Sequence, residues 1–388
     1  MQNTMKVAYP MRIDAIDKHG GDVELIRIYI RCCQQAALRQ GVAFEGEILT
    51  SMNPDLSRFD LVHLTNTDRP IDLYAQFLAA KKAGKPMLIT PLHHSYREIE
   101  RYEHEGRGGL VGLVSGSLSF DILESLRTLI KSSKYQELRA ASWKALRRGI
   151  RQAQVEVLQG CRYVLVAADK EEADINSEIV QLSSKQVVKV RNGFEMPNSP
   201  PAQFKDRDID IAVVARVESR KNQIAILQAV ESLGLKAVFV GAPNPNHSGY
   251  VQRFRQRIAS SKSTYVPGVP PQEVAPILAR AKVHVAASWF EVSSQVDVSA
   301  YMHGCRVVAS RCGGTSELLG EDAYYVDPGS PSDIAEKIAL AVRDASDGKK
   351  NMVEIVSNRL ETWNHIAERL LDLYVRTIES VTPDNGHL

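Results

Sequence analysis

Short runs of consecutive apolar residues alternate with helical stretches along the whole chain. In the first half the predicted strands are Met5–Tyr9, Leu61–Leu64, Met87–Thr90, Arg162–Ala167 and Gln186–Val190. In the second half they are Ile209–Ala215, Ala237–Val240, Ser263–Val266, Val283–Ala287, Arg306–Ala309 and Ala323–Val326. Apolar strands separated by helices are typical of a parallel sheet covered on both faces. The pattern therefore predicts an α/β protein.

The alternation is interrupted once, by the Pro-rich and polar stretch Pro197–Ala202, which has the composition of a linker. A chain of 388 residues also exceeds what one core usually serves. We therefore expect two tandem Rossmann-like domains, residues 1–198 and 207–360, joined by a linker at 199–206. Apolar residues at helical spacing predict a terminal helix within Ser357–Ile378, whose simplest packing partner is the second domain. Ligands of such sheets bind at the carboxyl ends of the strands, so we expect a central cleft between the domains.

Composition excludes several classes of protein. The hydrophobic fraction of 44%, the charged fraction of 24% and the net charge of +2 are those of a globular protein and not of a nucleic-acid binder. The five cysteines include no C-x-x-C pair, which favours a reducing compartment over disulfides or metal ligation. No apolar run reaches the roughly 18 residues of a membrane span, and the N-terminus lacks a signal-peptide pattern. We expect a cytoplasmic protein, peripheral on a membrane at most.

The stretch from Val285 to Ala309 carries the strongest functional signal. It predicts a buried strand, a loop with Glu291, a helix entered through Ser293 and Ser294, and a second buried strand. A helix start aims free N–H groups and the positive end of the helix dipole at one point, which suits a phosphate or diphosphate. A carboxylate beside that point suits sugar hydroxyls. The stretch therefore predicts a nucleotide-sugar site.

Two cations follow the first strand of the second domain. Arg216 and Lys221 stand at its carboxyl end, where they can neutralise a diphosphate leaving group, although Arg and Lys are also common on solvated turns. The D-x-D spacing within Asp206–Asp210 precedes a strand, at the wrong end of the sheet for a ligand, and is interpreted as linker charge. No other cluster has metal-ligand spacing.

These motifs together resemble the retaining glycosyltransferases of the group called glycosyltransferase family four, which have the GT-B fold. In the second half the resemblance rests on Arg216 with Lys221–Asn222, Val238–Gly241, Gly268–Val269, Glu291 with its helix, Val307–Ser310, Gly313–Glu317 and Val326–Pro328. In the first half it rests more loosely on Gly20–Gly21, Thr90–His93 and Asn192–Gly193.

The resemblance implies a role for each site residue. Arg216 and Lys221 would bind the donor diphosphate, Glu291 the transferred sugar, and His93 would lie near the reacting carbon and the acceptor. The residues assigned to donor binding are Gly20, Gly21, Gly241, Val269, Ser293, Ser294, Gln295, Val296 and Ser299. The terminal segment 361–388 would cross back onto the first domain. A UDP- or GDP-sugar would be the donor substrate, with a glycan or lipid-linked acceptor and no metal or other cofactor.

One position departs from the family pattern. The family places a second carboxylate eight residues after Glu291, where it accepts hydrogen bonds from the ribose, and this chain has Ser299 there. The lost charge-assisted bonding is on the order of 1–3 kcal/mol. Asp297 cannot replace the carboxylate, because two residues along a helix turn it by roughly 200°. We therefore expect weak nucleotide affinity, an unusual base or sugar, or a degenerate site.

The residues leave further alternatives open. His93 can equally be a satisfied structural histidine. The segment 126–151 is cationic and amphipathic, so it can lie on an anionic membrane or simply cover the core. The function we predict is that of a retaining glycosyltransferase of the hexosyltransferase type, active in cell-surface polysaccharide or glycolipid synthesis. The alternatives are a non-catalytic GT-B subunit or scaffold, favoured by Ser299, a nucleotide-sugar epimerase, and a pyridoxal-dependent phosphorylase.

Overall fold

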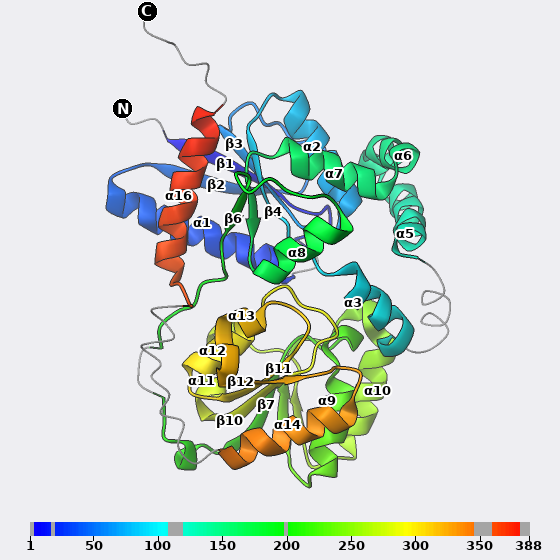
Figure 1. Ribbon diagram of the computed structural model, residues 1–388, viewed down its shortest axis with the longest axis vertical. Coiled ribbons are helices and arrows are strands. Elements are labelled where there is room, and N and C mark those ends of the chain that lie inside the picture. The colour runs from blue at the N-terminus through cyan, green and yellow to red at the C-terminus, as the bar shows by residue number, and fades with distance from the viewer. Residues whose placement is uncertain (1–3, 17–19, 108–118, 198–200, 345–358, 381–388) are drawn as a thin grey trace, which may run out of the picture. The chain divides into compact units, whose positions relative to one another are not determined.

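The computed structural model describes residues 4–16, 20–107, 119–197, 201–344 and 359–380, which form two compact units. Each unit contains a six-stranded sheet whose neighbouring strands are all parallel (Figure 1). The predicted α/β class with two Rossmann-like sheets is therefore confirmed.

The first unit has the strand order β2-β1-β3-β4-β5-β6. Its strands are β1 (Met5–Pro10), β2 (Phe44–Leu49), β3 (Leu61–Thr65), β4 (Met87–Thr90), β5 (Val164–Val166) and β6 (Val187–Lys189). Its helices are α1 (Gly21–Gln40), α2 (Pro70–Lys82), α5 (Phe120–Lys134), α6 (Arg139–Arg148), α7 (Ile150–Gly160), α8 (Asp169–Glu178) and α16 (Trp363–Glu379), with a 3-10 turn η2 (Gln136–Leu138).

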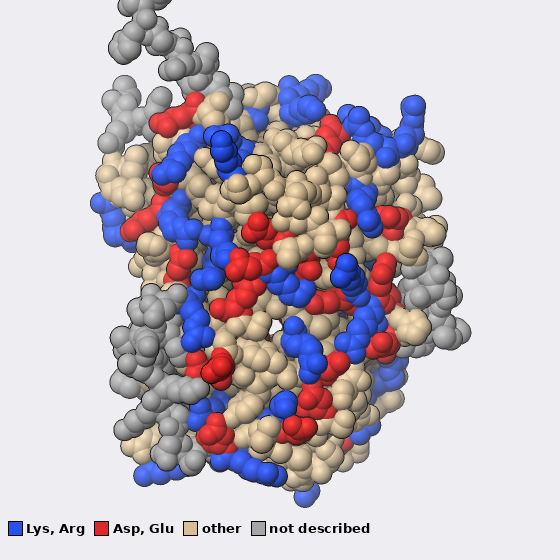
Figure 2. All heavy atoms as spheres, in the orientation of Figure 1, with Lys and Arg blue, Asp and Glu red and all other residues tan. Residues whose placement is uncertain are grey.

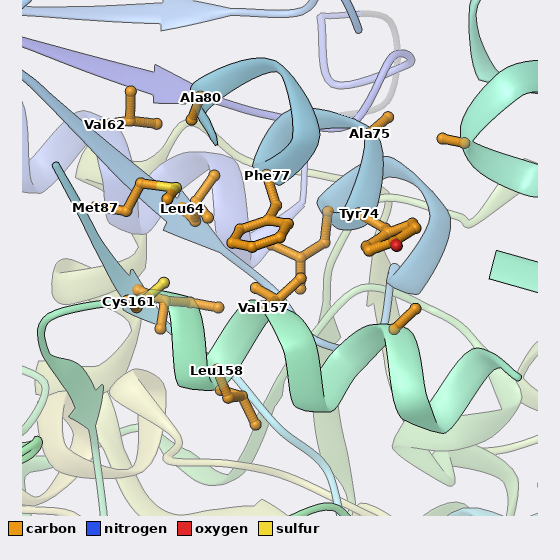
Figure 3. Close-up of a cluster of buried hydrophobic side chains, with 14 of the residues drawn as sticks. Val62, Leu64, Tyr74, Ala75, Phe77, Ala80, Met87, Val157, Leu158 and Cys161 are labelled. Atoms are coloured by element: carbon orange, nitrogen blue, oxygen red, sulfur yellow. The ribbon is translucent and has the colours of Figure 1, made fainter. Parts of the chain in front are cut away.

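One face of this sheet is covered by α2, α6, α7 and α8. Phe77 of α2 and Val157 of α7 point toward one another and toward Leu64 of β3 (Figure 3), and all three are nearly free of solvent. Helix α2 is buried along Pro70–Phe77, because α6 and α7 pack on it from outside while its inner side contacts β3. This packing forms the first core.

The opposite face is covered by α1 and by the terminal helix α16, which packs along α1 (Figure 1). The buried hydroxyl of Tyr374 bonds Tyr9 at 2.8 Å and Nδ1 of His63 at 2.9 Å, which fixes α16 to two strands. Burial lowers the pKa of His63 to about 3, so the ring is neutral. The expectation that the terminal helix crosses back to the first domain is confirmed, and packing on the second domain alone was wrong.

The second unit has the strand order β12-β11-β10-β7-β8-β9. Its strands are β7 (Ile209–Val214), β8 (Ala237–Val240), β9 (Thr264–Val266), β10 (Ala281–Ala286), β11 (Arg306–Ser310) and β12 (Ala323–Val326). Helices α9 (Gln223–Ser232), α10 (Ser248–Ala259) and α14 (Pro331–Arg343) share one core with the sheet, and α11 (Pro271–Arg280), α12 (Gln295–Met302) and α13 (Thr315–Leu319) share the other. Short turns are η3 (Phe204–Asp206), η4 (Ser219–Lys221), η5 (Pro245–His247) and η6 (Gly320–Asp322).

Two features were not anticipated. Strand β2 was missed, because its sequence Phe-Glu-Gly-Glu-Ile-Leu lacks an apolar run, and all six residues are half-buried at a sheet edge. The described segment 96–107 follows β4 in sequence but belongs to the second unit, as do the described residues from Asn192 to Glu361. It begins with α3 (Tyr96–Arg101) and a π-helical turn η1 (Tyr102–Gly106). The predicted domains were consecutive ranges of the chain, so they could not place a segment of the first half in the second unit.

Lys and Arg are interspersed with Asp and Glu over the face in view in Figure 2. Among the described residues, none of the helices combines the length and the apolar character that crossing a bilayer requires.

Candidate functional site

The predicted donor-site residues of the second unit follow the carboxyl ends of neighbouring strands. Strands β7 and β10 lie side by side, and their following helices cover opposite faces of the sheet. At such a switch point the two following loops diverge and leave room for a ligand. Arg216 and Lys221 follow β7, and Glu291 follows β10.

The loops after β7 and β10 are joined by an ion pair. Lys221 Nζ contacts Glu291 Oε1, and Arg220 Nη1 lies 3.6 Å from Glu291 Oε2. The Lys221 and Glu291 side chains retain 19% and 15% of their solvent exposure, so a ligand can reach both. Arg220 is also tied to the second loop, because its Nη1 donates to the carbonyl of Phe290 at 3.3 Å and its carbonyl accepts from Trp289 N at 2.9 Å.

A buried carboxylate beneath this pair organises the cations. Glu218 is only 4% exposed and lies 3.2 Å from Arg216 Nε and 3.0 Å from Arg220 Nη2, while Asn244 donates to it at 2.6 Å. Burial alone would raise the pKa of Glu218, but Arg220, Arg216 and Lys221 outweigh burial and lower the pKa to about 2. Glu218 therefore stays charged and holds both guanidinium groups in place.

Close approach of the strand ends requires glycine at Gly241. Its φ is 156°, and a Cβ there would lie 1.9 Å from the carbonyl oxygen of Ala215. Gly241 thus lets the ends of β8 and β7 come together, which explains its place in the motif. Val269, the residue predicted to pair with the base, is half-buried in the loop after β9, on the same edge of the sheet.

Helix α12 begins at Gln295, as predicted. Its N-cap Ser294 accepts a hydrogen bond from Asp297 N at 3.3 Å. Within the described residues, the amides of Gln295 and Val296 have no hydrogen-bond partner, and the buried hydroxyl of Ser293 has none either. Free amides at a helix start attract anions, so this end of α12 retains the capacity that the sequence suggested.

The structure shows where Ser299 and Asp297 lie. Ser299 lies one turn into α12 and is half-buried. Asp297 is 2% exposed and bonds His284 Nε2 at 3.1 Å and Thr315 Oγ1 at 3.2 Å. The inference that Asp297 points elsewhere is correct, so the carboxylate missing at position 299 is not supplied by Asp297.

Gly20, Gly21 and His93 belong to the first unit. Gly20 is the N-cap of α1 in an extended conformation, and a Cβ there would lie 2.5 Å from Asp22 Oδ1. Among the described residues outside its own helical turn, no atom lies within 4 Å of a Cβ placed on Gly21. Their assignment to the donor stays a prediction.

His93 is 1% exposed and both ring nitrogens are engaged. Nε2 lies 3.0 Å from Glu178 and Nδ1 lies 3.2 Å from the hydroxyl of Thr67. Burial lowers the pKa of His93, but Asp68 and Glu178 outweigh burial and raise it to about 9. His93 is thus a charged, satisfied histidine in the first unit, and its role toward an acceptor stays a prediction.

The acidic D-x-D stretch serves as surface charge. Asp208 pairs with Arg280 and Asp210 with Lys282 at 2.8 Å, beside the amino ends of β7 and β10. The described part of the chain contains no group of three or more His, Cys, Asp or Glu residues arranged to hold a metal ion.

Reasoning from sequence missed Glu218 and Arg220. Both lie inside the Arg216–Asn222 stretch that was singled out, and the adjacent Arg220–Lys221 pair was the available signal. Burial of Glu218 was not visible in a loop sequence, since charged loop residues are usually solvated.

Comparison with known proteins finds similar glycosyltransferases. Residues 208–344 match the family described as Glycosyl transferases group 1. The chain is 24% identical over 284 residues to the MMP α-(1→4)-mannosyltransferase of Mycolicibacterium hassiacum, covering 68% of this chain and 67% of that protein. It is 24% identical over 226 residues to one component of the human phosphatidylinositol N-acetylglucosaminyltransferase, covering 56% of this chain and 45% of that protein.

Solved structures show the same fold. Sucrose-phosphate synthase from Thermosynechococcus elongatus superimposes with a TM-score of 0.69 at 15% identity, covering 97% of this chain and 100% of that chain. Anabaena HepE in complex with UDP and glucose gives a TM-score of 0.63 at 15% identity, covering 96% and 99%.

The two parallel sheets and the loops of the second unit define the class: the protein has the GT-B fold of glycosyltransferases. Residues 208–344 match the glycosyl transferases group 1 family, and the protein is a glycosyltransferase. The resemblance to family four and the general function inferred from sequence are thus confirmed.

Proposed function

We propose that the protein is a retaining glycosyltransferase that moves a hexosyl group from a UDP- or GDP-sugar to a glycan or lipid-linked acceptor, in synthesis of a cell-surface polysaccharide or glycolipid. The observation that carries the proposal is the Lys221–Glu291 ion pair beside Arg220, at the carboxyl ends of β7 and β10. It is supported by relatives whose names specify mannosyl or N-acetylglucosaminyl transfer and by HepE structures with UDP, glucose and UDP-glucose.

The charges of the site suit a diphosphate leaving group. Arg216, Arg220 and Lys221 face two carboxylates, those of Glu218 and Glu291, which leaves an excess of positive charge. An arriving diphosphate would compete with Glu291 for Lys221, and the released carboxylate would accept hydrogen bonds from the sugar. The free amides at the start of α12 would add fixed donors, and such preorganised charge is usually the largest catalytic contribution.

The reaction needs no strong general base if the departing phosphate accepts the proton of the acceptor hydroxyl. No metal is required in this proposal either, because the three cations supply the positive charge. We therefore expect EDTA to leave transfer unchanged. A preparation that loses activity with EDTA and regains it with Mg²⁺ or Mn²⁺ would contradict this part.

Ligand-dependent thermal melting tests the donor assignment. A ligand present at 100 times its Kd stabilises the folded protein by about 2.7 kcal/mol, so UDP or GDP and their sugars should raise the Tm. Lys221→Ala and Glu291→Gln should each reduce transfer on the order of 10²–10³-fold with unchanged circular dichroism. Near-normal turnover in either variant would refute the assignment. The anomeric configuration of the product, read by NMR, tests retention.

Ser299 favours one competing function, that of a non-catalytic GT-B scaffold. A serine cannot accept both ribose hydroxyls as a carboxylate can, so affinity for the nucleoside would fall. Calorimetry with UDP and GDP separates the two functions, because a scaffold should bind neither. Ser299→Glu should tighten nucleotide binding if the site is active.

We further propose that α5 and α6 contact an anionic membrane surface. Helix α5 buries the polar residues Glu124 and Thr128 together with Phe120, while most of its other apolar residues are exposed. The exposed apolar side chains of the two helices are Ile122, Leu126, Leu129, Ile130 and Trp143. Within the described residues, four nearby cations form no ion pair: Lys134, Arg139, Lys144 and Arg147. Apolar and cationic groups on one exposed hairpin suit an anionic bilayer.

Flotation with phosphatidylglycerol vesicles tests this contact. Binding should fall in the double variant Ile130→Ser with Trp143→Ser and should be weak on phosphatidylcholine vesicles. Val375→Ser removes an exposed apolar side chain elsewhere and serves as the control. Equal flotation of the double variant and the wild type would contradict the proposal.

A further inference from the structure

The segment formed by α3 and η1, Tyr96–Gly106, comes from the first half of the sequence but packs on the donor-site loops of the second unit. It contacts the loop after β7 through Tyr102, whose hydroxyl bonds Ser219 Oγ, and Ser219 Oγ in turn lies 2.9 Å from His247 Nδ1. Ser219 stands directly before Arg220 and Lys221, so this bond fixes the turn that carries two of the site's cations.

The same segment contacts the loop after β10. The Tyr102 ring packs edge-on against Phe290 with centroids 5.4 Å apart, and Gly106 lies under the indole of Trp289. A Cβ on Gly106 would come within 2.4 Å of Trp289 Cε2, so only glycine permits this contact. Trp289 and Phe290 immediately precede Glu291, and both are tied to Arg220.

A third contact anchors the segment to the loop after β12. Arg101 Nη2 lies 2.8 Å from Asp327 Oδ1, and its guanidinium lies over the Trp289 ring at 5.6 Å. This third loop is itself linked to the first, because Asn222 Nδ2 donates to the carbonyl of Pro328 at 2.8 Å. Three loops at one sheet edge are thus held by one short segment.

The local backbone is consistent with a specialised role. Residues Tyr102–Gly106 form a π-helical turn, with Arg107 N donating to Tyr102 O at 2.8 Å across five residues. Such turns are rare and often occur at functional sites. The wider spacing allows Tyr102 and Gly106, four residues apart, both to face the loops.

From these contacts we infer that Tyr96–Gly106 is a positioning element of the donor site, with Tyr102 and Arg101 as positioning residues for Lys221 and Glu291. The identity of the ligand in this inference rests on the proposed function, whereas the contacts of the segment do not depend on it. The donor site is then not a property of the second half of the chain alone. It requires a segment that is joined at its start, through Ser95, to the strand-end loop carrying His93.

The test combines hydrogen exchange of the free full-length protein with calorimetry using UDP and GDP as probes. Tyr102→Phe removes the bond to Ser219 and keeps the ring, while Tyr102→Leu removes both. Loss of one hydrogen bond corresponds to a roughly two- to tenfold effect. Tyr102→Phe should therefore raise amide exchange in peptides covering 219–222 and 288–291 and weaken nucleotide binding by roughly two- to tenfold, and Tyr102→Leu should do so more strongly.

Arg101→Gln breaks an independent anchor and should give the same pattern in the same peptides. The matched control is Tyr324→Phe, which removes a tyrosine hydroxyl bonded to Asp344 in the same unit and should change neither readout. Unchanged exchange in both Tyr102→Phe and Arg101→Gln overturns the inference, and so does faster exchange with unaltered nucleotide affinity. A wild type that binds neither UDP nor GDP refutes the proposed function instead, and the exchange data then decide whether the segment holds the loops.

Discussion

Replacing Glu218 with glutamine tests how the cations of the donor site are held. The pKa of Glu218 is lowered to about 2 from its usual 4.5, against the effect of burial, by Arg220, Arg216 and Lys221. A difference of about 2.5 pH units corresponds to about 3 kcal/mol of stability for the charged form. Because the folded-state pKa is depressed, this stability is present above pH 4.5 and is lost as the pH falls toward 2. At pH 3 about half of it should remain.

Glu218→Gln should therefore lower the free energy of unfolding of the second unit by about 3 kcal/mol at pH 7 and by about half that at pH 3. Pulsed hydrogen exchange across a urea series, read in peptides from β7 and β8, measures this unit separately from the first. Glu231→Gln is the control, since its carboxylate pairs with Arg257 near the surface of the same unit and should contribute less than about 1 kcal/mol. An equal loss at both pH values, or a loss no larger than in the control, would refute the electrostatic argument.

Three further predictions concern other parts of the fold. Gly241→Ala should destabilise the second unit by more than about 2 kcal/mol and abolish nucleotide binding. The control Gly249→Ala lies in an open helical position and should stabilise the unit by up to about 1 kcal/mol, and thermal melting compares the two variants. Tyr374→Phe should cost the first unit about 1–3 kcal/mol in urea unfolding, because it leaves buried His63 Nδ1 without its partner. The first unit should lose stability as the pH rises from 7 through about 9, since the raised pKa of His93 stabilises only its protonated form, and His93→Gln should flatten that profile.

Much of the site could be predicted because it follows strand ends. Arg216, Lys221 and Glu291 each follow a run of apolar residues, and parallel strands bring their carboxyl ends to one edge. The start of α12 could also be predicted from its local sequence, because serine, here Ser294, is a common N-cap residue. The Lys221–Glu291 contact could not be predicted, because it joins residues 70 positions apart whose register depends on how β7 and β10 align.

By itself the sequence determined the α/β class, the strands of the second unit, the family resemblance and the chemistry of the donor loops, because periodicity and strand-end motifs are local properties. Only the tertiary structure decided that Glu218 is buried beneath the cations, that His93 is enclosed by acids, and that Tyr96–Gly106 packs with the second unit. The physical reason is that burial and pairing depend on which distant side chains share a space. Which distant side chains come into contact is decided only when the sheets and helices pack, so no local pattern along the chain can specify it.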